Sequence, residues 1–492
     1  MPESPSLLFV FTDQQATTSL GCYGNDAVET PNIDAFAAAG TRFANAYCTQ
    51  PVCTPNRSAM LTGLYPHATG LTENNTPLPS HLDCLPELGD FDEYTTAFMG
   101  KWDLGNEIYP QHGFDRWVSI EDGYRDQYTR PDADRVHSTY HEFLVDEGFE
   151  PDSEDGTFSR QFAADLPEEY TKAAYLGNEA TRFIEEHRDE PFILYVSFLE
   201  PHSPFFGPRD DQYDADDIDL PANFEHEGLD DQPLRARLFR EYRRRPDSEW
   251  RELVSRYWGL ASLVDTHAGR IFDTLEETGR DEDTVAVYTS DHGTMMGSHQ
   301  LVGKNVLFEE STRIPLLLRL PGEQLPPVVD HPVSQIDLVP TLLDALGVDP
   351  PDHLHGYSLL PFLRGERDAP VEPNVFGEQN GPDGEGVGRR KDRWPDRGSL
   401  PELADEVLDV AAEWGVGEDE VRRAYQQPVR TVVTPDGWKL NYRPDGHHEL
   451  YDLTADPGET ENRAGAEPDR VAELRDAILD WQVRTRDPVH LH

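Results

Sequence analysis

Short apolar runs alternate with helical patterns before residue 370, and this alternation limits the possible folds more than any other feature. Four of the runs are largely apolar, which is typical of strands buried on both faces. They occupy residues 6–12, 94–99, 192–199 and 284–289. Helical spacing of apolar residues separates them, most clearly at 250–275. The alternation predicts an α/β fold in which helices sandwich a large, mostly parallel sheet.

Polar residues whose side chains can bind ligands or transfer protons follow each of these four runs. They are Asp13 and Gln14, Lys101 and Asp103, His202, and Asp291 and His292. Ligand sites of open α/β sheets lie at the carboxyl ends of the strands, so these side chains are expected at one edge. Two carboxylates brought together repel each other, and a bound cation relieves the repulsion. The sequence therefore predicts an active site with a metal ion at this edge.

The pattern changes near residue 370, and two domains are predicted, at 1–370 and 371–492. Beyond the boundary, short strand-like runs at 429–433, 438–442 and 449–453 precede a helix at 471–483. They predict a smaller C-terminal domain with an antiparallel sheet and a terminal helix. The acidic stretch 120–168 and the Gly-, Pro- and charge-rich stretch 380–428 are expected to be irregular insertions, the second with a helix at 403–412.

The charge of the chain is strongly negative, with 94 acidic and 42 basic residues and a net charge of −52. An apolar content of 37% is too high for a disordered acidic chain. The charge would repel nucleic acids and anionic membranes, so neither is an expected partner. It indicates a high-salt cytoplasm, such as that of a halophilic archaeon, where screening relieves self-repulsion. The alternative is an acidic protein of an ordinary cytoplasm.

A reducing, cytoplasmic location is expected from the cysteines and the apolar runs. Four cysteines without a spacing framework do not indicate disulfides. No apolar run is long enough for a membrane span, and residues 1–5 lack the basic start of a signal peptide. The sequence leaves the choice between a monomer and a homo-oligomer open.

The segment Cys53-Thr54-Pro55-Asn56-Arg57-Ser58-Ala59-Met60-Leu61-Thr62-Gly63 has the pattern of a short helix. Pro55 suits the first turn and Gly63 can end the helix. Cys53 would then lie in the positive field of a helix start, with Arg57 one turn further on. The pattern favours an anionic ligand at Cys53; the alternative is a buried, inert thiol.

Cys53, Pro55, Arg57 and the Leu61-Thr62-Gly63 triplet resemble the signature of the type I sulfatases of the alkaline phosphatase superfamily. Further motifs follow in the family's order, so the resemblance covers nearly the whole chain. It implies an alkaline-phosphatase-like fold and a sulfuric ester hydrolase, arylsulfatase-like in type. It also implies that a maturation enzyme converts Cys53 to formylglycine, an aldehyde whose hydrate is the nucleophile.

The resemblance further implies that Asp13, Gln14, Asp291 and His292 bind one divalent cation, usually Ca²⁺. Many members have Asp in place of Gln14 and Asn in place of His292. The expected ligand set thus has fewer carboxylates and one imidazole, which favours tolerance of Mn²⁺ or Mg²⁺. Ca²⁺ remains the first expectation.

Lys101, His202 and Lys304 match the sulfate-binding positions of the family, and Arg57 would orient the nucleophile. His299, in Gly297-Ser298-His299-Gln300, either touches the substrate or supports a residue that does. Asp103 departs from the family, whose Gly-Lys-Trp-His-Leu-Gly motif has a histidine there that is thought to take a proton during regeneration of the aldehyde. A carboxylate is a weaker base, so Asp103 either takes over this role or leaves it to another group.

Two other functions fit the same residues. Phosphonate monoester and phosphodiester hydrolases of the superfamily share the Asp-Gln and Asp-His pairs and the formylglycine, but tend to lack the lysine that matches Lys101. A non-catalytic, anion-binding relative would keep Cys53 as a thiol. For the sulfatase, a sugar, an aryl group or a small alcohol would serve as the esterified part of the substrate.

Overall fold

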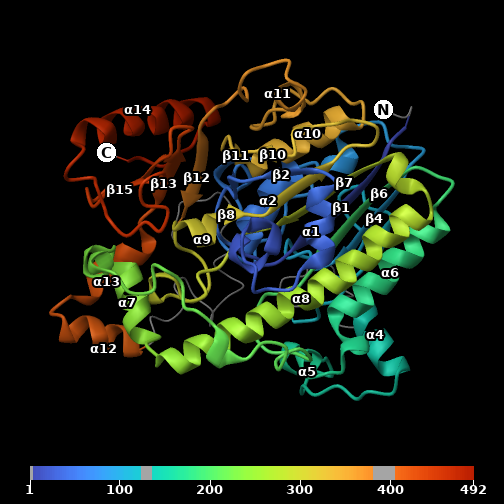
Figure 1. Cartoon of the computed structure of the whole chain (residues 1–492), viewed down its shortest axis with the longest axis horizontal. Helices are drawn as coiled ribbons and strands as arrows, with labels where there is room; N and C mark the ends of the chain where they lie inside the picture. The colour runs from blue at the N-terminus through green and yellow to red at the C-terminus, as the bar shows by residue number, and fades with distance from the viewer. Residues whose placement is uncertain (1–3, 124–135, 381–404, 492) are drawn as a thin grey trace.

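The computed structural model of the chain describes residues 4–123, 136–380 and 405–491, and a large sheet lies at its centre (Figure 1). Eight strands form this sheet in the order β10-β2-β9-β7-β1-β6-β4-β5. Their bounds are β1 Ser6–Thr12, β2 Thr41–Phe43, β4 Thr95–Gly100, β5 Arg116–Val118, β6 Phe192–Phe198, β7 Thr284–Ser290, β9 Leu316–Arg319 and β10 Val328–Val329. The predicted α/β fold is confirmed.

The centre of the sheet is parallel, and β1 pairs with β6 on one side and with β7 on the other. All residues of these three strands are buried, as the continuous apolar runs predicted. Strand β9 runs antiparallel to both β7 and β2, so the sheet is mixed. Pro315 precedes β9 and separates it from the residues before it, because a proline lacks an N–H to donate to a neighbouring strand. Residues before the proline form β8 (Arg313–Ile314), which pairs with another strand, β3 (Ala46–Tyr47).

Helices cover both faces of the sheet (Figure 1). Their bounds are α1 Pro31–Ala38, α2 Cys53–Thr62, α3 Pro66–Thr69, α4 Thr139–Asp146, α5 Arg160–Ala164, α6 Lys172–Glu186, α7 Leu234–Tyr242, α8 Asp247–Glu277, α9 Glu309–Thr312, α10 Leu338–Ala345 and α11 Leu360–Leu363. Helices α1, α6 and α8 contribute to one buried core with Leu8 and Val10 of β1. Helices α2 and α10 contribute to the opposite core with Phe9 and Phe11. Successive β1 residues thus serve opposite cores, the alternation of a strand buried on both faces.

Two smaller sheets accompany the central one. Strands β11 (Val333–Ser334), β3 and β8 form the first. The second is antiparallel, and its members are β12 Val375–Gln379, β13 Val429–Val433, β14 Trp438–Tyr442 and β15 Glu449–Asp452. Helix α14 (Pro468–Thr485) packs on this sheet, which confirms the expected C-terminal antiparallel sheet with its terminal helix. A shared apolar cluster that includes Ala59 joins this sheet to helix α2.

The two predicted insertions are more ordered than expected. Within 120–168, Ser138 and Ser159 cap the short helices α4 and α5 by accepting backbone hydrogen bonds, so the expectation of an irregular stretch was wrong there. Within 380–428, the expected helix is present as α12 (Asp405–Glu413), and a further one, α13 (Glu418–Gln426), was not predicted. The remainder, 381–404, lies outside the described residues. None of the helices in the described ranges has the length and apolarity to cross a membrane.

Candidate active site

Cys53 is the first residue of α2, and all ten residues of this helix are buried. Val52 precedes it with an extended backbone, and Gly63 ends it at a φ of 69°, in the left-handed region that favours glycine. The predicted helix, its start and its end are therefore confirmed. The cysteine side chain points into the region at the carboxyl ends of β1 and β7, where Asp13 and His292 contact its sulfur.

Three groups surround the Cys53 sulfur. Lys304 Nζ lies 2.7 Å from Sγ, His292 Nε2 lies 3.3 Å away and Asp13 Oδ1 lies 3.6 Å away. Burial, followed by the negative charge of Asp13, raises the pKa of the Cys53 thiol to about 11. An unmodified Cys53 is therefore a protonated thiol at neutral pH, which is a poor nucleophile.

Asp13, Cys53, Asp291 and His292 bring one possible ligand atom each within 4.8 Å of the others, and all four side chains are buried. His292 Nδ1 lies 2.9 Å from the Gly293 carbonyl oxygen, while Nε2 faces Cys53 and Asp291. Burial lowers the pKa of His292 to about 4, so its ring is neutral at neutral pH and has a lone pair for a ligand. Two carboxylates and one neutral imidazole fit a divalent cation such as Ca²⁺, Mn²⁺ or Mg²⁺.

Gln14 lies beside this cluster with a φ of 70°. Its backbone N–H donates to Asp291 Oδ1 at 3.0 Å, and its side-chain Nε2 donates to Thr294 Oγ1 at 3.1 Å. These contacts fix the orientation of Gln14 next to the two carboxylates. Its predicted role as a metal ligand stays a prediction.

Three buried or largely buried cations contact the same carboxylates. Arg57 Nε lies 2.8 Å from Asp291 Oδ2, and its Nη2 lies 3.3 Å from Asp13 Oδ2. The Lys101 ammonium contacts Asp13 Oδ2, and Lys304 Nζ lies 3.6 Å from Asp13 Oδ1. Burial alone would raise the pKa of Asp13, but these cations, Lys101 foremost, bring it well below its ordinary value. Asp13 is therefore ionised and able to bind a cation.

Asp103 lies on a tight turn after β4 at a φ of 59°, in the left-handed region. Its Oδ2 accepts a hydrogen bond from Thr54 Oγ1 at 3.1 Å and lies 3.8 Å from Lys101 Nζ. The Glu107 carboxylate accepts the backbone N–H groups of Trp102 at 2.6 Å and of Asp103 at 2.8 Å, and so holds the turn. The structure thus brings Asp103 next to the residue that follows Cys53.

The two histidines predicted outside the metal cluster lie in different surroundings. His202 is close enough to Asp13, Lys304 and Lys101 for their charges to act on its pKa, which burial brings well below the ordinary value. His299 instead stacks on Phe308 with ring centroids 4.0 Å apart, and its ring nitrogens contact a separate polar set, namely Asn223, His226 and Gln232. The site role of His299 stays a prediction, and its contacts are those of a supporting residue.

The profile of the sulfatase family matches residues 5–348 of the chain. The chain belongs to the sulfatase family. Among characterised and uncharacterised relatives, the Escherichia coli protein described as uncharacterized sulfatase YidJ is 30% identical over 98% of this chain and 88% of that protein. An N-acetylglucosamine-6-O-sulfatase of Bacteroides thetaiotaomicron is 28% identical over 75% of this chain and 72% of that enzyme. The chain is accordingly a sulfatase-type hydrolase.

The fold is also shared with solved structures. The phosphonate monoester hydrolase SpPMH from Silicibacter pomeroyi superposes with a TM-score of 0.75 at 24% identity, over 98% of this chain and 96% of that one. The superposition confirms the alkaline-phosphatase-like architecture of this sulfatase.

Several residues that support the sulfatase site were not predicted from the sequence. Ser197 Oγ, at the end of β6, accepts from Arg57 Nη1 at 2.9 Å, and the Asn56 amide donates to the Asp291 carbonyl oxygen. Glu107 holds the turn that carries Lys101 and Asp103. Ser197 ends a predicted buried strand and Asn56 lies within the Cys53 motif, so their positions were a signal. Glu107 had no such signal in the sequence beyond its position four residues after Asp103.

Proposed function

We propose that this sulfatase hydrolyses an organic sulfate monoester with a formylglycine made from Cys53 as its nucleophile. The observation that carries the proposal is the position of Cys53 at a buried helix start, against two carboxylates and the Lys304 ammonium. The raised thiol pKa supports it, because an unmodified Cys53 would remain protonated at neutral pH. A hydrated aldehyde at this position needs no thiolate.

Two groups that are not encoded in the sequence, formylglycine and a divalent cation, would each supply part of the chemistry. Formylglycine would supply a hydroxyl that attacks the ester sulfur and an aldehyde that is restored when sulfate leaves. A divalent cation held by Asp13, Asp291 and His292, with Gln14 alongside, would supply positive charge next to residue 53. We propose Ca²⁺ first for this ion, with Mn²⁺ or Mg²⁺ as substitutes, since the donor set contains both oxygen and imidazole.

The side chains of the chain would bind and orient the sulfate group. Lys101 and Lys304 would hold the sulfuryl oxygens and stabilise the negative charge that grows on them as the ester bond breaks. Arg57 would fix residue 53 and the two carboxylates relative to each other. Asp103 would take the proton that must leave residue 53 before sulfate departs, and His202 would contact the substrate from the β6 end.

The proposed substrate is a saccharide sulfate, supported by the N-acetylglucosamine-6-O-sulfatase among the relatives. An aryl sulfate would serve as a general test substrate. We also propose a cytoplasmic, high-salt location and a formylglycine-generating enzyme as a maturation partner, on the basis of the charge and the Cys53 motif. The division into a catalytic domain at 1–370 and a smaller domain at 371–492 stays part of this proposal.

The test is expression with and without a formylglycine-generating enzyme, followed by intact mass and activity measurements. Conversion of Cys53 lowers the mass by about 18 Da, and only the converted protein should hydrolyse sulfate esters. Sulfate esters, phosphodiesters and phosphonate monoesters are compared under the same conditions, with Cys53→Ala as the control. Preferred turnover of the phosphorus substrates would assign the hydrolase to the phosphonate class. Equal sulfatase rates with and without conversion would refute the formylglycine nucleophile.

A further inference from the structure

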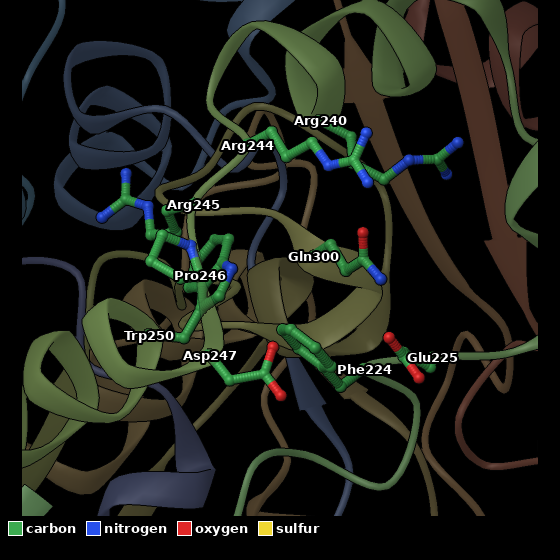
Figure 2. A pocket seen from close by; sticks show the side chains of 9 residues that line it. All are labelled: Phe224, Glu225, Arg240, Arg244, Arg245, Pro246, Asp247, Trp250 and Gln300. Carbon is green, nitrogen blue, oxygen red and sulfur yellow. The ribbon is translucent and has the colours of Figure 1, made fainter.

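A cavity of about 440 Å³ lies between α7, the start of α8 and the loop that carries Gln300, and arginines gather at it (Figure 2). Arg240 and Arg244 lie on one side of it, and Phe224, Asp247 and Trp250 lie on the other, with Gln300 between them. The remaining lining residues are Glu225, Arg245 and Pro246. The proposed sulfatase mechanism uses none of these residues.

The cavity shares a loop with the catalytic site. Gln300 ends the 3-10 helix Ser298–Gln300, and Lys304, whose ammonium contacts Cys53, follows four residues later. Four residues span at most about 14 Å even when fully extended, so the cavity lies within reach of an elongated substrate held at Cys53. Met296 and Val302 of the same loop pack with Phe224 and Trp250, and this apolar cluster ties the loop to the cavity wall.

The charge of this region is positive, whereas the charge of the whole chain is negative. Residues 234–245 contain six arginines and one glutamate, whereas the whole chain has a net charge of −52. Guanidinium groups gathered in one short segment repel one another, so their concentration around a cavity needs a separate reason. Binding of an anion is such a reason, because a guanidinium presents paired N–H donors to carboxylate and sulfate oxygens.

These arginines form only weak ion pairs with carboxylates. Arg240 Nη2 lies 3.2 Å from an oxygen of Asp230, whose side chain is 89% exposed. Arg244, itself 78% exposed, lies 3.4 Å from Glu241. The Arg245 guanidinium lies over the Trp250 ring, 4.7 Å from its centroid. Exposed ion pairs contribute little free energy, so an anionic ligand can displace them at low cost.

The other residues that line the cavity indicate which further chemical groups the ligand contains. Glu225 and Asp247 offer carboxylate acceptors and Gln300 offers an amide, which suit hydroxyl groups. Phe224 and Trp250 add apolar wall. This mixture matches a polyhydroxylated ring with a charged substituent better than it matches an inorganic anion alone.

We propose that this arginine cavity binds a second anionic group, a carboxylate or a sulfate, of a saccharide whose sulfate ester lies at Cys53. The substrate is then an oligosaccharide with at least two anionic groups, and the loop from Gln300 to Lys304 forms part of both sites. This inference rests on the proposed sulfatase function for the catalytic end of the substrate, but the binding of the anionic saccharide can be measured without turnover.

The kinetic test uses the exposed and half-exposed arginines of the cavity, Arg244 and Arg245. In Arg244→Gln/Arg245→Gln, KM for a sulfated tetrasaccharide with alternating uronate residues should rise at least about tenfold, while kcat stays the same, since each charged hydrogen bond contributes appreciably to affinity. The kinetics of 4-nitrophenyl sulfate, which is too short to reach the cavity, should not change. Arg188→Gln is the matched control, since this 67% exposed arginine lies before β6, near the opposite edge of the sheet.

A binding test separates this inference from the proposed function. The same tetrasaccharide is titrated into Cys53→Ala by calorimetry, with and without the Arg244→Gln/Arg245→Gln replacement, at one fixed salt concentration. Weaker binding in the arginine variant alone supports the cavity even when no sulfate ester is hydrolysed. Equal binding by both proteins overturns it, as does an equal loss with Arg188→Gln or an equal rise in KM for 4-nitrophenyl sulfate.

Discussion

The Lys304 ammonium lies 2.7 Å from the Cys53 sulfur, and Asp13 Oδ1 lies 3.6 Å from each of them. A lysine, the first residue of α2 and a strand-end carboxylate therefore meet at one point. Lys304 is one of five lysines in the chain, and it comes to this point from a loop after β7 rather than from a neighbouring strand. The contact joins the helix start to the loop that also borders the arginine cavity.

Lys304→Ala should lower kcat for a sulfate ester by about 100-fold or more, the usual loss when one donor to a developing negative charge is removed. The side chain is only 15% exposed but sits at the rim of the buried cluster, so the thermal midpoint should change little. Steady-state kinetics and thermal unfolding of the matured protein check both expectations. A normal kcat in the alanine variant would remove Lys304 from the catalytic residues.

Removal of divalent cations should abolish turnover and lower the thermal midpoint, because an ion bound only by the folded state stabilises it. Added Ca²⁺, Mn²⁺ or Mg²⁺ should restore both. Asp291→Asn should lose this thermal response, whereas Glu310→Gln, in a second polar group with His299 and Glu459, should keep it. Turnover that survives complete chelation would contradict a metal role for Asp13, Asp291 and His292.

The contact between His67 and Glu378 should make stability depend on pH. His67 Nδ1 lies 2.6 Å from Glu378 Oε1, and Nε2 lies 3.1 Å from the Thr485 carbonyl oxygen. Burial alone would lower the pKa of His67, but the Glu378 charge raises it above the ordinary value. A raised pKa in the folded state means that the protonated ring stabilises the fold below the unfolded pKa of about 6.5, and that this contribution is lost as the pH rises through the folded pKa.

The midpoint difference between wild type and His67→Gln should therefore be largest near about pH 6 and smaller near about pH 9, with a free-energy difference of about 2 kcal/mol at the acidic end. Thermal unfolding across this range measures it. A difference that stays constant with pH would contradict a charged His67.

The strands and helix α2 were predictable because their signals are local. Three of the four apolar runs are buried whole and the fourth is buried from Thr96 onward, while the Pro55 and Gly63 positions fix both ends of α2. Because ligand sites of open α/β sheets lie at the carboxyl ends of the strands, Asp13 and Asp291 were then expected to lie close together. The break between β8 and β9 at Pro315 also has a local cause, since a proline cannot donate to a neighbouring strand, but it was not predicted.

Other features depend on contacts between residues distant in sequence. Lys439, another of the five lysines, is buried between Glu309 and Glu459, 2.9 Å from each, and no spacing rule connects 309, 439 and 459. Glu107 is a local contact, but its function is to accept two backbone N–H groups, which only the turn geometry reveals. Helices α4 and α5 were missed because the acidic composition of their surroundings outweighed the serine caps.

Salt should stabilise the protein. A net charge of −52 repels itself, and at about 1 M salt the Debye length falls to about 3 Å, which screens most surface pairs. The thermal midpoint should rise by several degrees between about 0.1 M and about 1 M KCl, since screening favours the compact state. Sucrose of equal osmolality, which does not screen charge, is the control. A midpoint indifferent to KCl would contradict adaptation to a high-salt cytoplasm.

Asp103 stands where the Gly-Lys-Trp-His-Leu-Gly motif of the family has a histidine, and its replacement tests the two half-reactions separately. Its carboxylate accepts from Thr54, the residue after Cys53, and lies 3.8 Å from Lys101 Nζ. In the proposed mechanism Asp103 is the base that takes the proton from residue 53, a role that belongs only to the second half-reaction. Asp103→Asn should therefore release alcohol in a burst equal to the enzyme concentration and then stall.

Rapid-quench measurement of the alcohol and intact mass of the quenched protein check this expectation, and the stalled protein should retain one sulfuryl group. Asparagine keeps an acceptor for Thr54 and removes only the charge, while Thr54→Val removes the hydrogen bond and keeps the carboxylate. If Asp103 instead orients Lys101 through its charge, both half-reactions slow together in Asp103→Asn, because sulfate binding weakens before any bond breaks. Slow release of alcohol without retained sulfate would then exclude Asp103 as the base and make it a positioning residue for Lys101.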